Sequence, residues 1–300
     1  MAAAGHTVYM SHRPNGSSME KAMKQIETSI DGLIREGLAD ESYRQKVTKN
    51  LHCITNDDIP KIGQQVDFVF ESVFEKPEVK RSIFKLLNDN IRKDVILASN
   101  TSAMNIFGVL DGVVDDPDRV IIAHWFNPPH LMKLVEVVKG PQTSQKTTDT
   151  TVNLLQSIGQ KTTVLNKFIP GFVVNRLAVV ISRELCSMIE KGYVTAEDAD
   201  TTLRYTDGLR WGFEGPLHLV DYVGIGLTTI VGKTVLPSLC NDTDSIHYGE
   251  KLISEGKMGA STGEGLLKWD NIDAYTEKRN RRIIEMARLM QKWDKEDSEE

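Results

Sequence analysis

Apolar residues in the first half of the chain come in short runs rich in valine and isoleucine, and longer stretches with helical spacing separate these runs. Short β-branched runs bounded by polar residues predict strands, and strands that alternate with helices predict a mostly parallel sheet. The predicted strands are His6–Met10, Leu51–Ile54, Val66–Phe70, Val95–Ala98, Val120–His124, Leu134–Val138 and Thr162–Leu165.

The pattern changes after Pro170, where apolar residues recur every three or four positions and few strand-like runs remain. This spacing is typical of amphipathic helices. The predicted helices are Phe172–Ile189, Ala196–Arg204, Leu217–Leu239 and Asp273–Trp293. We therefore predict an α/β nucleotide-binding domain over residues 1–168, followed by an all-helical domain over residues 169–300.

The start of the chain matches the middle of a dinucleotide-binding βαβ unit and not its beginning. Ala2–Ala4 have the character of a last helical turn, Gly5 of the stop after it, and His6–Met10 of the second strand. The first strand and a Gly-x-Gly-x-x-Gly loop should come about 20 residues earlier. We therefore expect a Rossmann-like domain whose first strand and glycine loop are missing because the chain is truncated. Such a chain should bind a nicotinamide cofactor weakly, because that loop supplies N–H groups to the pyrophosphate.

Composition and charge exclude several classes of partner. The chain has 300 residues, is 40% hydrophobic and 26% charged, and carries a net charge of −6, which disfavours nucleic acid and acidic membranes. Three widely spaced cysteines, Cys53, Cys186 and Cys240, form no CxxC pattern, so we predict reduced thiols and no metal site. No apolar run reaches membrane-spanning length and no signal peptide is evident, which favours the cytoplasm.

A histidine and a glutamate flank a rigid proline turn. His124 ends one apolar strand, and Glu136 lies inside the next, Leu134–Val138. A carboxylate in an apolar strand is costly to bury without a partner, and the turn Asn127-Pro128-Pro129 brings His124 back toward it. Such a pair can take the proton of an alcohol while hydride leaves its carbon. The alternatives are a structural histidine and, for Glu136, a salt bridge between domains.

The residues that follow the first predicted strand bear on the choice of cofactor. An acidic residue at this place binds the ribose 2′-hydroxyl of NAD, whereas a nearby arginine accommodates the 2′-phosphate of NADP. Ser11 and Arg13 are found here, which favours NADP. The alternative is a polar turn ahead of Pro14-Asn15-Gly16, in which neither residue contacts a cofactor.

Seven short motifs occur in a fixed order between Gly5 and about Trp269. They are Phe70-Glu71-Ser72, Ala98-Ser99-Asn100-Thr101-Ser102, His124-Trp125-Phe126-Asn127-Pro128, Met132-Lys133-Leu134-Val135-Glu136-Val137, Pro170-Gly171-Phe172-Val173-Val174-Asn175-Arg176, Gly215-Pro216 with Leu219-Val220-Asp221-Tyr222-Val223-Gly224, and Thr262-Gly263-Glu264-Gly265. In this order they make the chain resemble the 3-hydroxyacyl-CoA dehydrogenase family, including its 3-hydroxybutyryl-CoA members. The resemblance implies a Rossmann-like domain, a helical dimerisation domain, NAD or NADP as cofactor, and a homodimer.

The resemblance also implies catalytic roles for four residues. It makes His124 similar to the family's catalytic histidine and Glu136 to the carboxylate that orients it. Ser102 falls at a serine that contacts substrate and cofactor, and Asn175 at an asparagine that positions the substrate. The structural alternatives are that Ser102 only caps the following helix and that Asn175 is a buried hydrogen-bonding residue between domains.

Further residues are implied as contacts of the cofactor. Besides Ser102, the resemblance places Asn127, Glu71 and Lys76 at or near cofactor-contacting positions. The alternative for Glu71 is an anion that stabilises the N-terminus of the next helix.

The substrate is a small molecule of one of two classes. Met132–Glu136 and Leu219–Gly224 resemble the acyl-CoA branch, but Ser261 replaces the family's lysine before Thr-Gly. Gly208–Trp211 is more similar to relatives that act on free hydroxy acids such as carnitine or gulonate, and Arg210 would then pair with a carboxylate, unless it only packs. We predict hydride transfer between a 3-hydroxyacyl substrate and nicotinamide. The alternatives are a dehydrogenase of a free small hydroxy acid, and a non-catalytic structural or binding member that has lost the cofactor.

Overall fold

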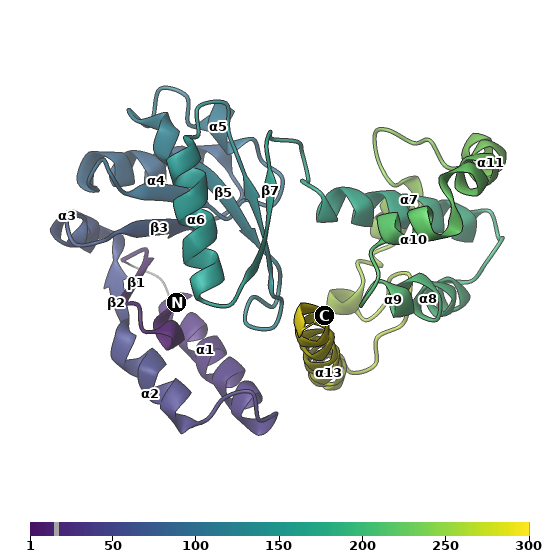
Figure 1. The fold of residues 1–300 in the computed structure, drawn as a ribbon, viewed down its shortest axis with the longest axis horizontal. Coiled ribbons are helices and arrows are strands. Elements are labelled where there is room, and N and C mark those ends of the chain that lie inside the picture. Colours follow the sequence, from purple (N-terminus) through teal and green to yellow (C-terminus); the bar gives the residue numbers. More distant parts are fainter. Residues whose placement is uncertain (15–17, 300) are drawn as a thin grey trace. The chain divides into compact units, whose positions relative to one another are not determined.

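The computed structural model describes residues 1–14 and 18–299 of the chain. It divides into two compact units, Met1–Val173 and Val174–Glu300. Figure 1 shows the first unit, coloured purple to teal, as strands with covering helices, and the second, green to yellow, as helices.

The first unit contains the seven predicted strands, with ends shifted by no more than two residues. They are β1 (Val8–His12), β2 (Leu51–Thr55), β3 (Phe68–Glu71), β4 (Ile96–Ser99), β5 (Val120–Trp125), β6 (Leu134–Val138) and β7 (Lys161–Leu165). Strands β1 and β2 form a parallel pair, and β3 to β7 form a five-stranded sheet in chain order. Among the pairs formed by the described strands β1 to β7, β5–β6 alone is antiparallel, so the mostly parallel α/β prediction is confirmed.

Two helices of the first unit begin at residues that favour a helix start. Pro77 opens α4 at a position where a missing N–H costs little, and Ser144 caps α6 by accepting from the N–H of Thr147. The α-helices are α1 (Ser18–Arg35), α2 (Glu41–Asn50), α3 (Ile59–Ile62), α4 (Pro77–Asn90), α5 (Ile106–Val109) and α6 (Gln145–Ser157). Short 3₁₀ turns, η1 to η3, cover Ala2–Ala4, Asn56–Asp58 and Pro117–Arg119.

The beginning of the chain folds as its sequence predicts. Ala2–Ala4 form a helical turn, and Gly5 ends it with φ 96°, a left-handed conformation that glycine adopts without strain. Strand β1 pairs only with β2, and β3 pairs only with β4. Within residues 1–14 and 18–299, each of these two strands therefore keeps one edge without a strand partner.

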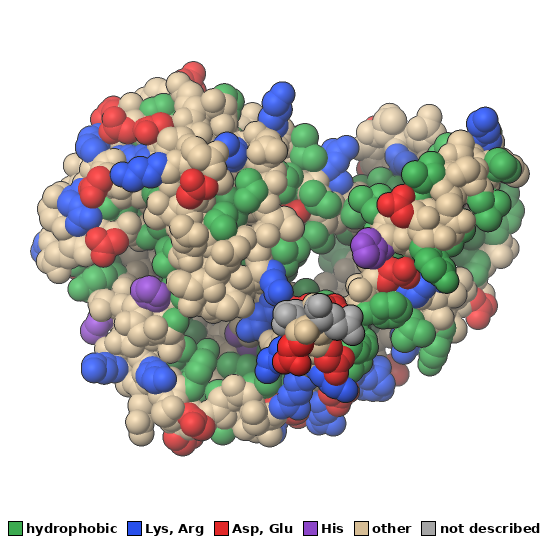
Figure 2. Space-filling model, viewed as in Figure 1, with side chains coloured by type: hydrophobic (Ala, Val, Ile, Leu, Met, Phe, Trp, Pro, Cys, Tyr) green, Lys and Arg blue, Asp and Glu red, His purple; other side chains and the backbone are tan. Residues whose placement is uncertain are grey.

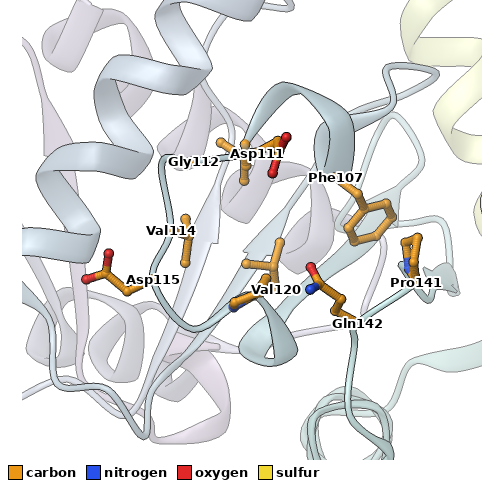
Figure 3. Close-up of a pocket in the computed structure, with 10 residues that line it drawn as sticks. Phe107, Asp111, Gly112, Val114, Asp115, Val120, Pro141 and Gln142 are labelled. Atoms are coloured by element: carbon orange, nitrogen blue, oxygen red, sulfur yellow. The ribbon is translucent and has the colours of Figure 1, made fainter.

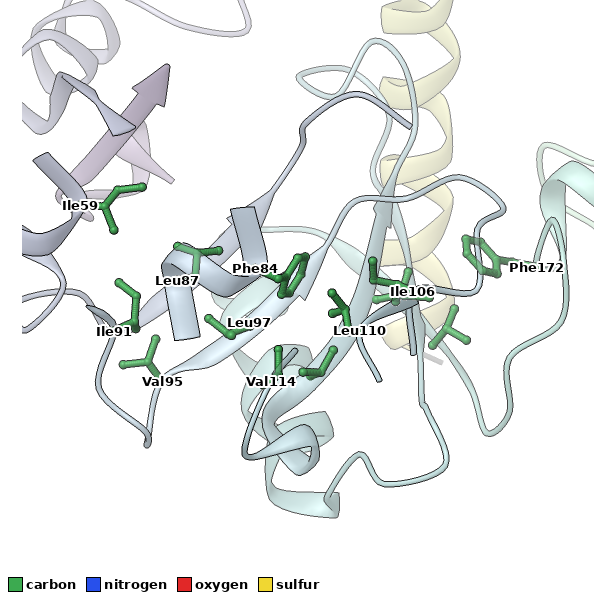
Figure 4. Packing of buried hydrophobic residues seen from close by; sticks show 13 residues of the cluster. Ile59, Phe84, Leu87, Ile91, Val95, Leu97, Ile106, Leu110, Val114 and Phe172 are labelled. Carbon is green, nitrogen blue, oxygen red and sulfur yellow. The ribbon is translucent and has the colours of Figure 1, made fainter. Parts of the chain in front are cut away.

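Alternation along the central strands divides the core of the first unit between two faces. On β4, Leu97 belongs to one buried cluster, whereas Ile96 and Ala98 belong to the other. Phe84 of α4 and Ile106 of α5 complete the first cluster, which Figure 4 shows. This period of two is what a sheet with both faces covered requires.

The second unit is helical, as predicted. Its helices are α7 (Val174–Glu190), α8 (Ala196–Arg204), α9 (Asp207–Arg210), α10 (Pro216–Val223), α11 (Ile225–Val235), α12 (His247–Ser254) and α13 (Ile272–Glu299), with 3₁₀ turns η4 (Leu236–Ser238) and η5 (Ala260–Thr262). The single helix predicted over Leu217–Leu239 is wrong. Gly224 breaks it with φ 103°, a conformation in which any residue with a Cβ would be strained.

No single helix among the described residues is both long and apolar enough to cross a membrane. Pro216–Val223 and Ile225–Ser238 pass that test only when taken together, and a bend of 107° separates them.

Candidate active site

His124 and Glu136 face each other across the antiparallel β5–β6 pair. They are register partners, and His124 Nδ1 lies 3.0 Å from Glu136 Oε2. Both residues are buried, with Glu136 fully inaccessible to solvent. The second carboxylate oxygen, Oε1, accepts a hydrogen bond of 2.9 Å from the backbone N–H of Val173. Glu136 thus has the partners that a buried carboxylate needs.

This contact sets the chemistry of the imidazole. A carboxylate only accepts hydrogen bonds, so Nδ1 of His124 carries the proton and donates it to Glu136. In the neutral ring, Nε2 then keeps its lone pair and can accept a proton from a substrate hydroxyl. The ring centres of Phe126 and Phe172 lie 4.6 and 5.3 Å from the centre of the His124 ring, and these neighbours restrict the orientation of the imidazole.

The loop after β4 is held by an acidic residue that the sequence analysis missed. Glu75 Oε1 accepts from the hydroxyl of Thr101 and, at 3.1 Å, from the backbone N–H of Ser102. Burial works to raise the pKa of the Glu75 carboxyl, but these bonds and the charge of Lys80 outweigh it and hold the pKa below its usual range. Ser102 itself is exposed on this fixed loop. Thr101 also accepts from the N–H of Met104 and so shapes the turn, whereas the N-cap residue of the following helix α5 is Asn105.

A buried ion pair between Lys80 and Glu71 lies next to Glu75, the residue that holds this loop. Lys80 Nζ lies 2.9 and 3.0 Å from the two carboxylate oxygens of Glu71, and 3.2 Å from Glu75. Glu71 also accepts from the Ser99 hydroxyl at 2.6 Å and from the N–H of Val73 at 2.7 Å. Because Glu71 is buried and both its oxygens have protein partners, the geometry favours a structural role over contact with a cofactor.

Sequence reasoning missed Lys80 because a lysine on a helix is usually solvated. The available signal was Glu71 at the end of an apolar strand, because a carboxylate that is buried there needs a cation as its partner. Asn100 was also missed. Its side-chain oxygen accepts from the N–H of Trp125 at 2.9 Å and so ties the loop after β4 to the end of β5.

The remaining predicted residues lie at several places. Ser11, on β1, donates to Asn56 Oδ1 at 2.7 Å, and the Arg13 guanidinium lies 5.2 Å from the centre of the Phe74 ring. The exposed Asn127 is joined to Pro128 by a cis peptide bond. Lys76, also exposed, occupies the N-cap position of α4 without a side-chain capping bond. Asn175 is the second residue of α7, in the second unit. Asn15–Ser17, which include part of the proposed polar turn, are outside the described residues.

The candidate groups lie at the carboxyl ends of parallel strands. Arg13 follows β1 of the two-stranded sheet, whereas Phe74 and Ser102 follow β3 and β4 of the five-stranded sheet, and His124 lies near the end of β5. Open α/β sheets bind nucleotides at the carboxyl ends of their strands. The exposed side chains of Arg13 and Ser102 at these strand ends can donate hydrogen bonds to the adenosine and nicotinamide ends of a dinucleotide. In the described part of the chain, no Gly-x-Gly-x-x-Gly turn joins a strand to a helix, so a pyrophosphate cradle is not seen.

A cavity of about 160 Å³ lies elsewhere, and Figure 3 shows it. Val120, the first residue of β5, lines it together with Phe107 and Asp115. His124 is four residues further along the strand, about 13 Å away at roughly 3.3 Å per residue, so this cavity is not at the His124 site. Nor do residues 1–14 and 18–299 bring together three histidine, cysteine or acidic side chains that could hold a metal ion.

Comparison with known proteins identifies the family. Residues 1–168 match the NAD binding domain of 3-hydroxyacyl-CoA dehydrogenase, and residues 171–269 match its C-terminal domain. The chain belongs to the 3-hydroxyacyl-CoA dehydrogenase family. The resemblance stated from the motifs is therefore confirmed, and the chain is an NAD- or NADP-dependent oxidoreductase of the hydroxyacyl-CoA or hydroxy-acid type.

Relatives in this family fall into both substrate classes. The mitochondrial hydroxyacyl-coenzyme A dehydrogenase of Sus scrofa is 35% identical over 273 residues, which cover 89% of this chain and 85% of that protein. The L-carnitine dehydrogenase of Bacillus cereus is 30% identical over 288 residues, which cover 91% and 82%. The crystal structure of an NAD⁺-dependent 5-formyl-3-hydroxy-2-methylpyridine 4-carboxylic acid 5-dehydrogenase superposes with a TM-score of 0.86 at 27% identity and covers 97% and 94% of the two chains.

Proposed function

We propose that the protein transfers hydride between a 3-hydroxyacyl-CoA ester and a nicotinamide cofactor, with His124 as the general base. The observation that carries this proposal is the 3.0 Å contact between His124 Nδ1 and the buried Glu136. It leaves Nε2 as the proton acceptor and stabilises the imidazolium that forms, as the buried aspartate does in hydrolase triads. The proton of the alcohol moves to Nε2 as the C–H hydride leaves, and the reverse reaction returns it.

Other residues of this chain orient the reactants. The hydroxyl of Ser102, on the loop fixed by Glu75, would hydrogen-bond the substrate oxygen, whose charge changes during the reaction. Asn175 on α7 is proposed as a second such group. Nicotinamide supplies the hydride acceptor when it is bound, and Asn127, Ser102, Lys76 and Arg13 are the residues proposed to hold the cofactor.

The substrate choice rests on Arg210. This residue would have to meet the carboxylate of a free hydroxy acid, but its Nη2 already pairs with Asp207 Oδ1 at 2.7 Å. A guanidinium with an acidic partner attracts a second carboxylate less strongly, because its charge is already compensated. This pairing favours the CoA ester.

The substrate assay follows directly. The initial rate of NADH or NADPH oxidation is measured with acetoacetyl-CoA and with acetoacetate and dehydrocarnitine at equal concentrations. We expect a kcat/KM at least 10-fold higher for the CoA ester. A preference for a free acid would support the hydroxy-acid alternative. No turnover with any of the three would support the non-catalytic one.

We further propose that the second unit carries substrate contacts and forms a homodimer, and that the first unit holds the cofactor. Helices α10 and α11 expose large apolar side chains, with Leu217 79%, Tyr222 86% and Ile230 64% accessible. Figure 2 shows apolar side chains gathered on the surface of this unit. Contiguous apolar surface of this kind usually marks an interface. The mass in solution tests this: we expect a dimer, and a shift to monomer for Ile230→Glu.

A reducing compartment, the cytoplasm, is proposed from the thiols. Cys53, Cys186 and Cys240 are all free, and burial raises the pKa of the Cys186 thiol, which keeps it protonated and unreactive. Fractionation of cells that express the tagged protein tests the location, and recovery in a membrane or secreted fraction would contradict it.

A further inference from the structure

Arg13 is placed to meet an anion at the end of β1. It follows the strand directly and is exposed, and its guanidinium carbon lies 5.2 Å from the centre of the Phe74 ring. Phe74 belongs to the loop after β3, so the contact joins the carboxyl ends of β1 and β3, each of which keeps one edge without a strand partner among the described residues. The face of an aromatic ring attracts a guanidinium cation, and the N–H groups of the guanidinium remain available to a ligand.

The carboxylate that would select NAD is absent from this place. Residues 8–14, which form β1 and the turn after it, contain no Asp or Glu. On the neighbouring segment, the Asp58 carboxylate accepts from the N–H and hydroxyl of Thr55 and pairs with Lys61 at 3.0 Å. The Ser11 hydroxyl is committed as a donor to Asn56. Within the described residues, no carboxylate pairs with Arg13 either.

The backbone around Arg13 is also held in place. The ring of His12 donates from Nδ1 to the carbonyl oxygen of Arg13 at 2.7 Å, since a carbonyl only accepts. Phe74 remains 66% exposed, so the ring that holds Arg13 also offers an apolar surface at the same edge. An adenosine whose base packs on such a surface would bring its ribose close to Arg13.

We propose that Arg13, held by Phe74, binds the 2′-phosphate of NADP and makes the protein select NADP over NAD. A phosphate dianion accepts two parallel N–H bonds from a guanidinium. The 2′-hydroxyl of NAD carries no charge to attract a cation, and the carboxylate that usually accepts its hydrogen bond is absent from this place. The inference rests on the proposed function in one respect: it takes the carboxyl ends of these parallel strands as the cofactor site.

Adenosine 2′,5′-bisphosphate and 5′-AMP isolate this contact, because they differ only in the 2′-phosphate. Titration calorimetry with the purified chain should show tighter binding of the bisphosphate by about 10- to 100-fold, the range for one charge-assisted contact. Arg13→Gln should abolish this preference, and Arg13→Lys should keep part of it. The matched control is Arg35→Gln, which removes an exposed arginine whose Nε lies 3.9 Å from Glu36 at the far end of α1 and should leave the preference intact.

Equal affinity of the wild-type chain for the two nucleotides would overturn the proposal, as would binding of neither or an unchanged preference in a folded Arg13→Gln variant. Circular dichroism melting establishes the fold of each variant. The result is separable from the proposed function. Turnover of acetoacetyl-CoA at equal kcat/KM with NADH and NADPH would support the proposed function and contradict the role of Arg13. Selective binding of the bisphosphate without turnover would support the role of Arg13 and contradict the proposed function.

Discussion

The carboxylate of Glu136 bridges His124 and the backbone of Val173: one oxygen lies 3.0 Å from the imidazole Nδ1 and the other 2.9 Å from the amide nitrogen. Glu136→Gln keeps the shape but removes the charge that stabilises an imidazolium. We expect kcat to fall by about 10²- to 10⁴-fold, by analogy with the loss of the buried aspartate in hydrolase triads. Steady-state kinetics measures this, and the KM for the cofactor should change by less than about threefold. A kcat within about threefold of the wild-type value would show that the pair has no role in proton transfer.

The contact between Glu75 and the loop after β4 predicts a positioning effect. Glu75→Gln keeps an oxygen that can accept from Thr101 and Ser102 but removes the charge that meets Lys80. We expect a lower kcat with acetoacetyl-CoA, by about 10-fold, since a loosely held loop misplaces Ser102. The variant Glu78→Gln, in the first turn of α4, is the control. Equal kinetics of the Glu75 variant and the wild type would mean that the loop needs no such support.

The buried pair of Lys80 and Glu71 predicts a large effect on stability. Lys80→Met leaves the Glu71 carboxylate buried without its cation, which should cost about 3–5 kcal/mol in the free energy of unfolding. The double change with Glu71→Leu should recover part of that loss, because no charge then remains buried. Urea unfolding measures both values. A double variant less stable than the Lys80 variant would contradict this account of the pair.

His247 provides a pH dependence in the second unit. The carboxylate of Asp242, and then the hydrogen bond to Asp244, raise the pKa of His247 above its ordinary value of 6.5. A raised folded-state pKa stabilises the fold fully below the unfolded value, and this stability is lost as pH rises through the folded pKa. We therefore expect the melting temperature to fall from about pH 6.5 upward. His247→Gln should flatten that part of the curve, and an unchanged slope would assign the dependence to other groups.

Local patterns were sufficient to predict most of the elements. Short runs rich in valine and isoleucine, separated by helical spacing, placed the seven strands. A histidine and a glutamate 12 residues apart across a proline turn predicted the contact that the structure shows. The break at Gly224 was missed because the apolar pattern continues through it on both sides. Only the backbone conformation of that glycine divides α10 from α11.

The supporting shell of the site could not be predicted in the same way. Lys80, Glu71 and Ser99 come together from a helix and two strands, and no short-range spacing encodes such a contact. The family resemblance placed Glu71 near the cofactor, and its position at the end of a strand is shared by structural and binding residues alike. Burial distinguishes a structural residue from a binding residue at a strand end, and burial depends on which elements pack against that end.

The central claim is that His124 Nε2 accepts the proton, and His124→Asn tests it most directly. The Asn side-chain amide can take the place of Nδ1–H toward Glu136 but offers no base at the position of Nε2. The matched control is His130→Asn, at a partly buried histidine whose pKa is lowered by burial. The measurement is the single-turnover rate of hydride transfer to acetoacetyl-CoA at saturating NADPH, the direction in which the protonated Nε2 returns the proton to the substrate oxygen. We predict a fall of about 10²-fold or more for the His124 variant and less than about threefold for the control. A His124→Asn rate within about threefold of the wild type would contradict the account.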